Sequence, residues 1–211
     1  MFITFEGPEG SGKTTQLLRL KERLEAMGRQ VVATREPGGT AAGERIRSVL
    51  LDLEGGPLQP RTEALLFCAA RSELVSSVIR PALEAGRVVL CDRYADATLS
   101  YQGYGRGMRM EQLQSMNALA TGGLEPALTL LFDLPVEVGL GRRQRAGEGW
   151  NRFDAASVAF HERVRAGYLE LASLAPHRWR RVDADRSAEE VEASVTEIVI
   201  EALEVRHGAR S

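Results

Sequence analysis

The chain has 211 residues, 44% of them hydrophobic, and its 27 basic against 29 acidic side chains give a net charge of −2. This near-neutral balance argues against a surface built to bind nucleic acid. Apolar runs rarely exceed about six residues, far short of the roughly 18 of a membrane span, so we expect a soluble, cytoplasmic protein with no membrane partner. Cys68 and Cys91 follow no metal-ligand spacing and are expected to be reduced. Length and composition predict one domain over residues 1–205 and a frayed tail over 206–211.

A glycine-rich motif lies near the N-terminus, between an apolar run and a helical pattern. It fits G-x-x-x-x-G-K-[ST] and reads Gly7-Pro8-Glu9-Gly10-Ser11-Gly12-Lys13-Thr14-Thr15. Its glycines allow successive backbone N–H groups to point at phosphate oxygens, and the N-terminal end of the following helix adds positive charge. Lys13 is expected to reach the β- and γ-phosphates, and the Thr14 hydroxyl to hold Mg²⁺. The motif predicts a nucleoside triphosphate site; the alternative is a turn without a ligand.

Residues 31–34 predict a second strand, which ends at Arg35 and leads into a loop rich in glycine. Because ligands of α/β proteins bind at the carboxyl ends of strands, Arg35 is expected to meet a substrate phosphate. Residues 60–85 then predict one long helix. Phe67 and Arg71 lie one turn apart on it, so an aromatic plane and a forked donor could address one planar group. The alternative is a core residue beside a solvated charge.

Residues 88–92 predict a buried strand that ends in an acid. This pattern puts the carboxylate of Asp92 beside the magnesium ion of the glycine-rich loop. The next residue is Arg93, a phosphate ligand, where motor ATPases tend to have a glutamate that activates water, so transfer to an anionic acceptor is favoured over hydrolysis. Asp133, at the end of another predicted strand, is a second candidate ranked behind Asp92. Residues 101–107 are polar and glycine-rich, and a plain surface loop is the alternative to a role in the site.

Several arginines gather between glycines in the segment 142–153, which we interpret as a mobile lid that closes over transferring phosphates. An exposed helix end with solvated charges is the alternative. Five predicted strands alternate with helices along the chain. The expected fold is therefore a three-layer α/β fold of the P-loop class, with a five-stranded parallel sheet covered by helices on both faces.

At this point the chain resembles the bacterial thymidylate kinase family over nearly its whole length. The resemblance rests on residues 7–15 and on Thr34-Arg35-Glu36-Pro37-Gly38-Gly39-Thr40, Leu65-Leu66-Phe67 with Arg71, Asp92-Arg93-Tyr94 and Tyr101-Gln102-Gly103. The glycine-rich loop alone marks only a very large superfamily, whereas the other segments together are specific. The resemblance implies transfer of the γ-phosphoryl group of ATP to dTMP with Mg²⁺, giving dTDP and ADP for dTTP biosynthesis, by a homodimer.

The resemblance also implies a role for each matching residue. Residues 7–15 would hold ATP, with Thr14 and Asp92 serving magnesium. Glu9 would meet the sugar 3′-hydroxyl of the acceptor, and Arg35 and Arg93 its phosphate. Phe67 would stack on thymine and Arg71 would bond its carbonyl edge. The pocket would be completed by Thr98, Tyr101 and Gln102.

Family members carry the catalytic arginine either in the glycine-rich loop or in the lid. Gly10 occupies the loop position here, so the resemblance assigns the role to the lid, where Arg145 is favoured over Arg142 and Arg152. Lys13, Asp92, Arg93 and Arg145 form the expected catalytic set, and Arg142 is expected to contact ATP. Ala97 replaces the serine that is usual in the family, which removes a hydroxyl near the acceptor.

Two alternatives to this function are considered. The first is another kinase of the same architecture, acting on a different nucleotide or a deoxynucleoside. Arg35 and Arg93 favour a phosphorylated acceptor over an unphosphorylated one. The second is a nucleotide-dependent switch or motor, which would need a guanine-specifying N-K-x-D or a glutamate after Asp92, and the sequence contains neither.

Overall fold

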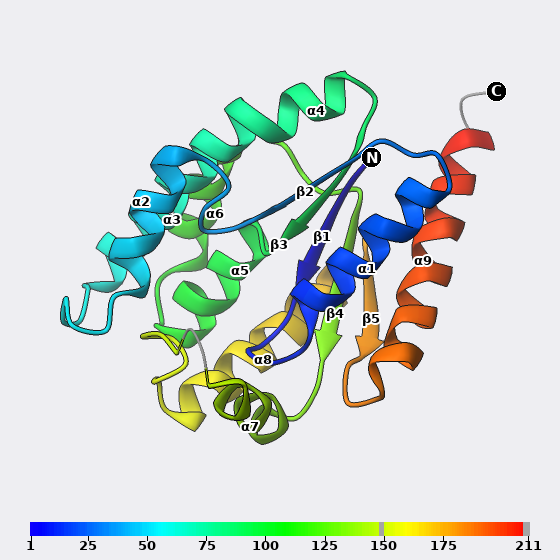
Figure 1. Cartoon of the computed structure of the whole chain (residues 1–211). Coiled ribbons are helices and arrows are strands. Elements are labelled where there is room, and N and C mark those ends of the chain that lie inside the picture. Colours follow the sequence, from blue (N-terminus) through cyan, green and yellow to red (C-terminus); the bar gives the residue numbers. More distant parts are fainter. Residues whose placement is uncertain (148–149, 209–211) are drawn as a thin grey trace.

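The computed structural model describes residues 1–147 and 150–208 and has a single parallel sheet at its centre (Figure 1). The strand order is β2-β3-β1-β4-β5. The strands are β1 (Phe2–Glu6), β2 (Val31–Arg35), β3 (Val88–Asp92), β4 (Leu128–Asp133) and β5 (Trp179–Asp183). Every neighbouring pair is parallel, so the predicted five-stranded α/β fold is confirmed.

Strand β1 lies in the middle of the sheet and is buried along its whole length. It is paired with β3 on one side and with β4 on the other, and Phe5 lies opposite Asp92 and Leu130. Because the strands are parallel, their carboxyl ends share one edge of the sheet. The glycine-rich loop that follows Glu6 therefore emerges beside the acid that ends β3.

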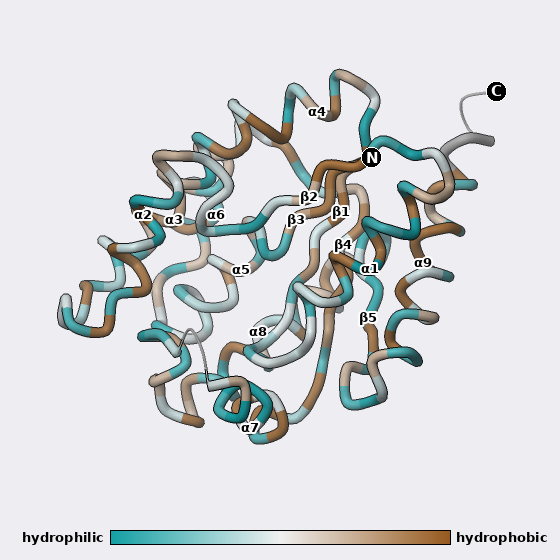
Figure 2. Tube along the Cα trace, viewed as in Figure 1, coloured by the Kyte–Doolittle hydropathy of each residue, from teal (hydrophilic) through white to brown (hydrophobic). Residues whose placement is uncertain are grey.

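Two helices cover one face of the sheet, α1 (Lys13–Ala26) and α9 (Ala188–Gly208). Their apolar side chains repeat at helical spacing and pack on the strands, among them Leu17, Leu20, Leu24, Val195 and Val199. Figure 2 shows hydrophobic residues gathered in the middle of the sheet and alternating with hydrophilic residues along the flanking helices. Gly12 is the N-cap of helix α1, and its φ of 82° is a left-handed conformation that glycine adopts without strain.

The other face is covered by a longer series of helical segments. They are α3 (Pro60–Leu74), the π-helical η1 (Val75–Ile79), α4 (Arg80–Glu84), α5 (Ala95–Thr98), the π-helical η2 (Leu99–Gly105) and α8 (Val158–Leu174). Helices α2 (Ala41–Leu51) and α6 (Met110–Thr121) pack against α3, and α7 (Val136–Ala146) follows β4. The predicted long helix over residues 60–85 is thus helical throughout, with one π-helical turn in it.

Three segments complete the comparison with the sequence-based expectation. Residues 99–105 form a π-helical segment with Tyr101 and Gln102 buried, which excludes the alternative of a plain surface loop there. Helix α9 continues to Gly208, past the point where the tail was expected to begin, and residues 209–211 lie outside the described part. Positions 148–149 of the expected lid likewise lie outside it. Within the described residues, no helix is both long and apolar enough to cross a membrane.

Candidate active site

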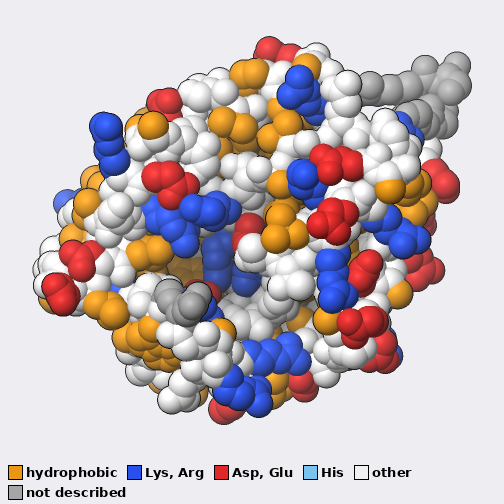
Figure 3. All heavy atoms as spheres, in the orientation of Figure 1, with side chains coloured by type: hydrophobic (Ala, Val, Ile, Leu, Met, Phe, Trp, Pro, Cys, Tyr) orange, Lys and Arg blue, Asp and Glu red, His pale blue; other side chains and the backbone are white. Residues whose placement is uncertain are grey.

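A cleft of about 430 Å³ opens at the carboxyl edge of the sheet. Figure 3 looks onto this face, where lysine and arginine side chains gather around a hollow. The glycine-rich loop forms one wall, and the start of the β2–α2 loop, α3, the end of β3 and η2 form the others. The lining side chains include Lys13, Thr14, Arg35, Arg47, Phe67, Asp92, Arg93, Thr98, Tyr101, Gln102 and Arg143.

The glycine-rich loop is held close to its neighbours by contacts that only glycine permits. Gly7 has a φ of 141°, and a Cβ there would lie 2.3 Å from the carbonyl oxygen of Phe132 in β4. Gly10 has a φ of 68°, and a Cβ there would lie 2.0 Å from the carbonyl oxygen of Gly139 in α7. A side chain at either position would displace backbone, so the loop is fixed between β4 and α7.

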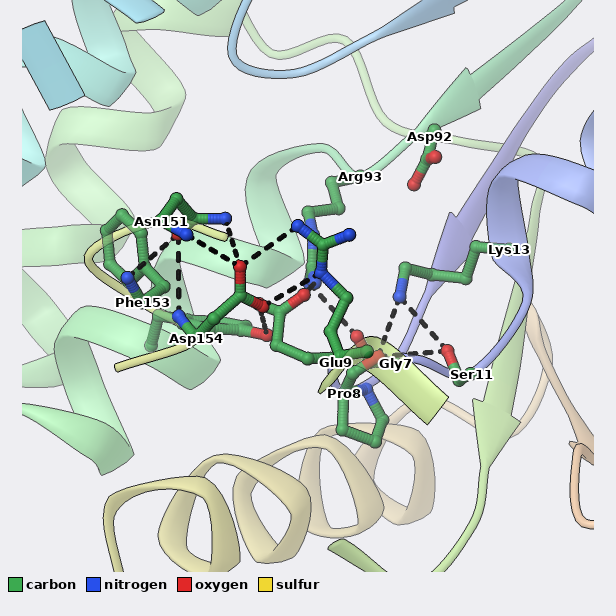
Figure 4. Close-up of polar contacts among 12 residues, drawn as sticks. Gly7, Pro8, Glu9, Ser11, Lys13, Asp92, Arg93, Asn151, Phe153 and Asp154 are labelled. Carbon is green, nitrogen blue, oxygen red and sulfur yellow. Dashed lines mark hydrogen bonds and ion pairs between the residues drawn. The ribbon is translucent and has the colours of Figure 1, made fainter. Parts of the chain in front are cut away.

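The Lys13 ammonium group is folded back across the loop. It donates hydrogen bonds to the carbonyl oxygen of Pro8 at 2.8 Å and to Ser11 Oγ at 3.0 Å (Figure 4). Burial, together with the charge of the nearby Arg93, lowers the pKa of Lys13 to about 8 against the opposing effect of Asp92. The loop thus encloses a desolvated cation whose present partners are neutral oxygens, an arrangement in which an incoming phosphate would be a better partner.

Thr14 and Asp92 meet at the junction of α1 and β3. The Thr14 hydroxyl donates to a carboxylate oxygen of Asp92. Hydroxyl and carboxylate oxygens suit Mg²⁺, which in phosphate sites is held by one or two protein oxygens together with phosphates and water. The pair therefore fits the metal that the sequence predicts at this place.

Arg93 lies at the centre of the cleft and connects three elements. Its Nη2 donates to Glu9 Oε2 at 2.9 Å, and its Nη1 donates to the carbonyl oxygen of Gly7 at 3.0 Å and to the Tyr168 hydroxyl at 3.2 Å. The guanidinium also lies over the ring of Tyr101, 4.9 Å from its centroid. Arg93 has a φ of 67°, rare for a residue with a side chain, which turns the chain sharply after β3.

Glu9 is the partner of both Arg93 and Tyr101, whose hydroxyl donates to Glu9 Oε1 at 2.8 Å. Burial alone would raise the pKa of Glu9, but the charges of Arg93 and Lys13 outweigh it and hold the pKa at about 2. Glu9 is therefore an ionised acceptor at neutral pH, able to receive a hydrogen bond from a substrate hydroxyl.

Phe67, Thr98 and Gln102 line the end of the cleft formed by α3 and η2, as the sequence predicts for one pocket. Arg71 lies behind this wall and is only 1% exposed. Its Nε and Nη2 both donate to Glu36 Oε2, at 2.9 and 2.6 Å, and Nη2 also reaches Thr98 Oγ1 at 3.1 Å. Arg35 lines the cleft, is half exposed and is paired with Glu44 at 3.0 Å.

Comparison with known proteins shows which family has this fold and this cleft. The model of the thymidylate kinase family matches residues 5–195. The chain belongs to the thymidylate kinase family. It is 55% identical over 199 residues to the thymidylate kinase of Desulfovibrio desulfuricans, covering 90% of this chain and 91% of the relative, and 53% identical over 210 residues to that of Thermomicrobium roseum, covering 100% and 98%. The crystal structure of thymidylate kinase from Ehrlichia chaffeensis superposes with a TM-score of 0.77 at 33% identity, covering 94% of this chain and 98% of the other.

The arginines proposed for the lid of this thymidylate kinase family member do not gather in the cleft. Arg142 donates to the carbonyl oxygen of Ala184 at 2.8 Å, and Arg145 bonds the backbone of its own helix at Gly141, 3.2 Å away. Arg152 donates to the carbonyl oxygen of Leu50 at 2.8 Å. None of these three side chains lines the cleft. All three side chains are therefore bonded to protein partners outside the lining of the cleft.

Sequence reasoning gave no role to two arginines that do line the cleft. Arg143 lies between Arg142 and Arg145 and is held by Asp154, whose two carboxylate oxygens accept from its Nε and Nη2 at 3.0 Å each. Arg47, on α2, donates to the carbonyl oxygen of Pro37 at 2.9 Å. A signal for Arg47 was available, because it follows Glu44, the partner of Arg35, by one helical turn. Nothing in the sequence indicates that Arg143 faces an acid eleven residues later.

The pKa of Lys13 leads to a test of its role in nucleotide binding. Above pH 8 the free protein carries a partly neutral Lys13, and a bound phosphate would restore the charge, so ADP binding at pH 8.5 should take up protons and weaken as the pH rises. Calorimetry in two buffers of different ionisation enthalpy measures this uptake. Lys13→Arg, which stays charged, should bind ADP with less proton uptake at pH 8.5, and equal uptake by the two proteins would contradict the assignment.

Proposed function

We propose that the cleft aligns ATP and dTMP so that the γ-phosphoryl group passes directly between them, giving ADP and dTDP. The observation that carries this proposal is Arg93, whose guanidinium lies between the glycine-rich loop and the pocket of Phe67 and Gln102. The phosphate of a nucleoside monophosphate is already an anionic nucleophile near neutral pH. Such a reaction needs alignment and charge neutralisation but no general base.

The donor side of the cleft is assigned to residues 7–15. The backbone N–H groups of the loop and the N-terminal end of α1 would bind the ATP phosphates, and Lys13 would leave Pro8 and Ser11 to reach them. Thr14 and Asp92 would hold Mg²⁺, which neutralises charge on the β- and γ-phosphates when it is bound. The hydrogen bond between these two residues supports the assignment because it places two hard oxygen donors side by side.

The acceptor side is assigned to the opposite half of the cleft. Arg35, Arg47 and Arg93 would neutralise the dTMP phosphate, and Glu9 would accept a hydrogen bond from the sugar 3′-hydroxyl. Phe67 would stack on the base, with Thr98, Tyr101 and Gln102 around it. Arg71, predicted to bond the base carbonyl, would act from behind the wall by holding Glu36 and Thr98, and it could reach the base only after a change of partners.

The arginine that stabilises the transferring group is the least determined part of the site. We place Arg143 ahead of Arg145, because Arg143 lines the cleft while Arg145 is bonded to its own helix. Arg142 donates to the carbonyl oxygen of Ala184, after β5, and Arg152 to that of Leu50 in α2.

We further propose that the chain acts as a homodimer in the cytoplasm. Apolar side chains on the outer helices of one side of the molecule support a second copy as the partner. They are Val49 on α2, Leu65 on α3 and Leu119 on α6, with exposed fractions of 52%, 54% and 86%. Light scattering coupled to size-exclusion chromatography tests this proposal, and a monomer at micromolar concentration would contradict it.

The acceptor is tested by the release of ADP in the presence of ATP and Mg²⁺. We expect release that depends on dTMP, weaker release with dUMP, and none with thymidine, because thymidine lacks the phosphate that the arginines would bind. Parallel reactions with dCMP, dGMP and no acceptor complete the set. Equal release without any acceptor would mean that water is the acceptor and would refute the role given to Arg93.

The lid arginine is tested by a matched pair of substitutions on one helix. Arg143→Ala should lower kcat by about 100-fold or more, with a change of less than about threefold in the KM for dTMP, because its contact would form mainly in the transition state. Arg145→Ala should change kcat by less than about threefold. The reverse pattern would return the role to Arg145, the residue favoured from the sequence.

A further inference from the structure

A buried carboxylate outside the assigned machinery lies under the base end of the cleft. Glu63 is in the first turn of α3 and is 1% exposed. Its Oε1 accepts from Gln102 Nε2 at 2.8 Å, and its Oε2 lies 3.3 Å from Arg106 Nη2 and 3.4 Å from Arg152 Nη2. Glu63 therefore connects α3 with η2 and with the segment that follows α7, and a residue with such partners is a candidate for positioning the pocket.

The two arginines determine what Glu63 can offer to Gln102. Guanidinium groups only donate hydrogen bonds, so the oxygens of Glu63 act as acceptors in this cluster. The Gln102 amide accordingly turns its NH₂ group toward Glu63. The orientation of this amide thus follows from the accepting oxygen that it faces.

The other end of the amide is left for a ligand. Gln102 lines the cleft, and in the described part of the chain no donor reaches its side-chain oxygen. Phe67 lies on the same wall and offers an aromatic face to a planar base. A base stacked there would meet a fixed hydrogen-bond acceptor in its plane, and the cleft would select bases by the group they present to that oxygen.

We propose that Glu63 is a specificity-determining positioning residue, which fixes the Gln102 amide so that the pocket takes a base with a ring N–H and rejects a base with a bare ring nitrogen. This inference rests on the proposed function. Thymine and uracil carry a hydrogen on N3 and can donate to the oxygen. Cytosine presents a lone pair at N3, so two acceptors would face each other.

The test replaces the acceptor-only carboxylate by a group that can also donate. In Glu63→Gln the new amide can present either its oxygen or its NH₂ group, so Gln102 is free to turn. We expect the ratio of kcat/KM for dTMP to that for dCMP to fall at least about tenfold. The ratio for dTMP to dUMP should stay within about twofold, because both bases carry the same ring N–H.

The matched control is Asp133→Asn. Asp133 is also buried and paired with two arginines, Arg165 at 2.7 Å and Arg181 at 2.5 Å, but it does not line the cleft. Its substitution should lower the melting temperature as Glu63→Gln does and leave both ratios unchanged. Glu63→Met, which removes the acceptor and keeps the length of the side chain, serves where Glu63→Gln does not fold, with the same expected loss of discrimination.

Each outcome bears on a different claim. A wild-type protein without activity on dTMP would refute the proposed function itself. An active wild type that turns over dCMP as well as dTMP, or a folded Glu63 variant that keeps the wild-type ratio, would overturn the inference alone. A fall in the ratio in Asp133→Asn as well would show a general loss of rigidity and would overturn it too.

Discussion

The ion pair between Arg93 and Glu9 is the contact on which the rest of the cleft depends. It joins the end of β3 to the tip of the glycine-rich loop, two segments separated by 84 positions. Its geometry requires an unusual backbone at Arg93, and Glu6 stabilises that turn by accepting a hydrogen bond from the backbone N–H of Tyr94 at 2.7 Å. The last residue of β1 thus holds the turn that follows β3. The pairing of β1 with β3 therefore positions the charged side chains of the site.

The parts of the site that could be predicted from the sequence are motifs of residues close together in the chain. The glycine-rich loop is one such motif, the acid at the end of β3 with the arginine after it is another, and neighbouring strand ends of a parallel sheet bring the two together. The partners of single arginines are not local. Arg142 and Arg143 are neighbours, yet one bonds the β5–α9 connection and the other faces the cleft, because successive residues on a helix point in directions about 100° apart.

Segment η2 shows why composition left two interpretations open at one place. Polar residues and three glycines between 101 and 107 are compatible with a surface loop, since glycine is common in turns. Here two of these glycines allow close packing instead. A Cβ at Gly105 would lie 2.6 Å from the ring of Phe160, and one at Gly103 would lie 2.6 Å from the sulfur of Met110. Tyr101 and Gln102 are buried for the same reason. A polar helix that is covered on both sides has no hydrophobic periodicity in its sequence by which it could be predicted.

The same kind of close packing limits where the proposed catalytic arginine can lie. Gly10 stands where some members of the family carry an arginine, but its Cα faces the backbone of Gly139, and a Cβ at Gly139 would in turn lie 2.3 Å from the carbonyl oxygen of Glu9. No side chain fits between these two backbones, so the charge must come from elsewhere. The contact that excludes an arginine from the loop also ties the loop to α7, the helix that carries Arg143. The backbone of Glu9 and the helix that carries Arg143 are therefore packed as one unit, so a displacement of α7 would act on both residues.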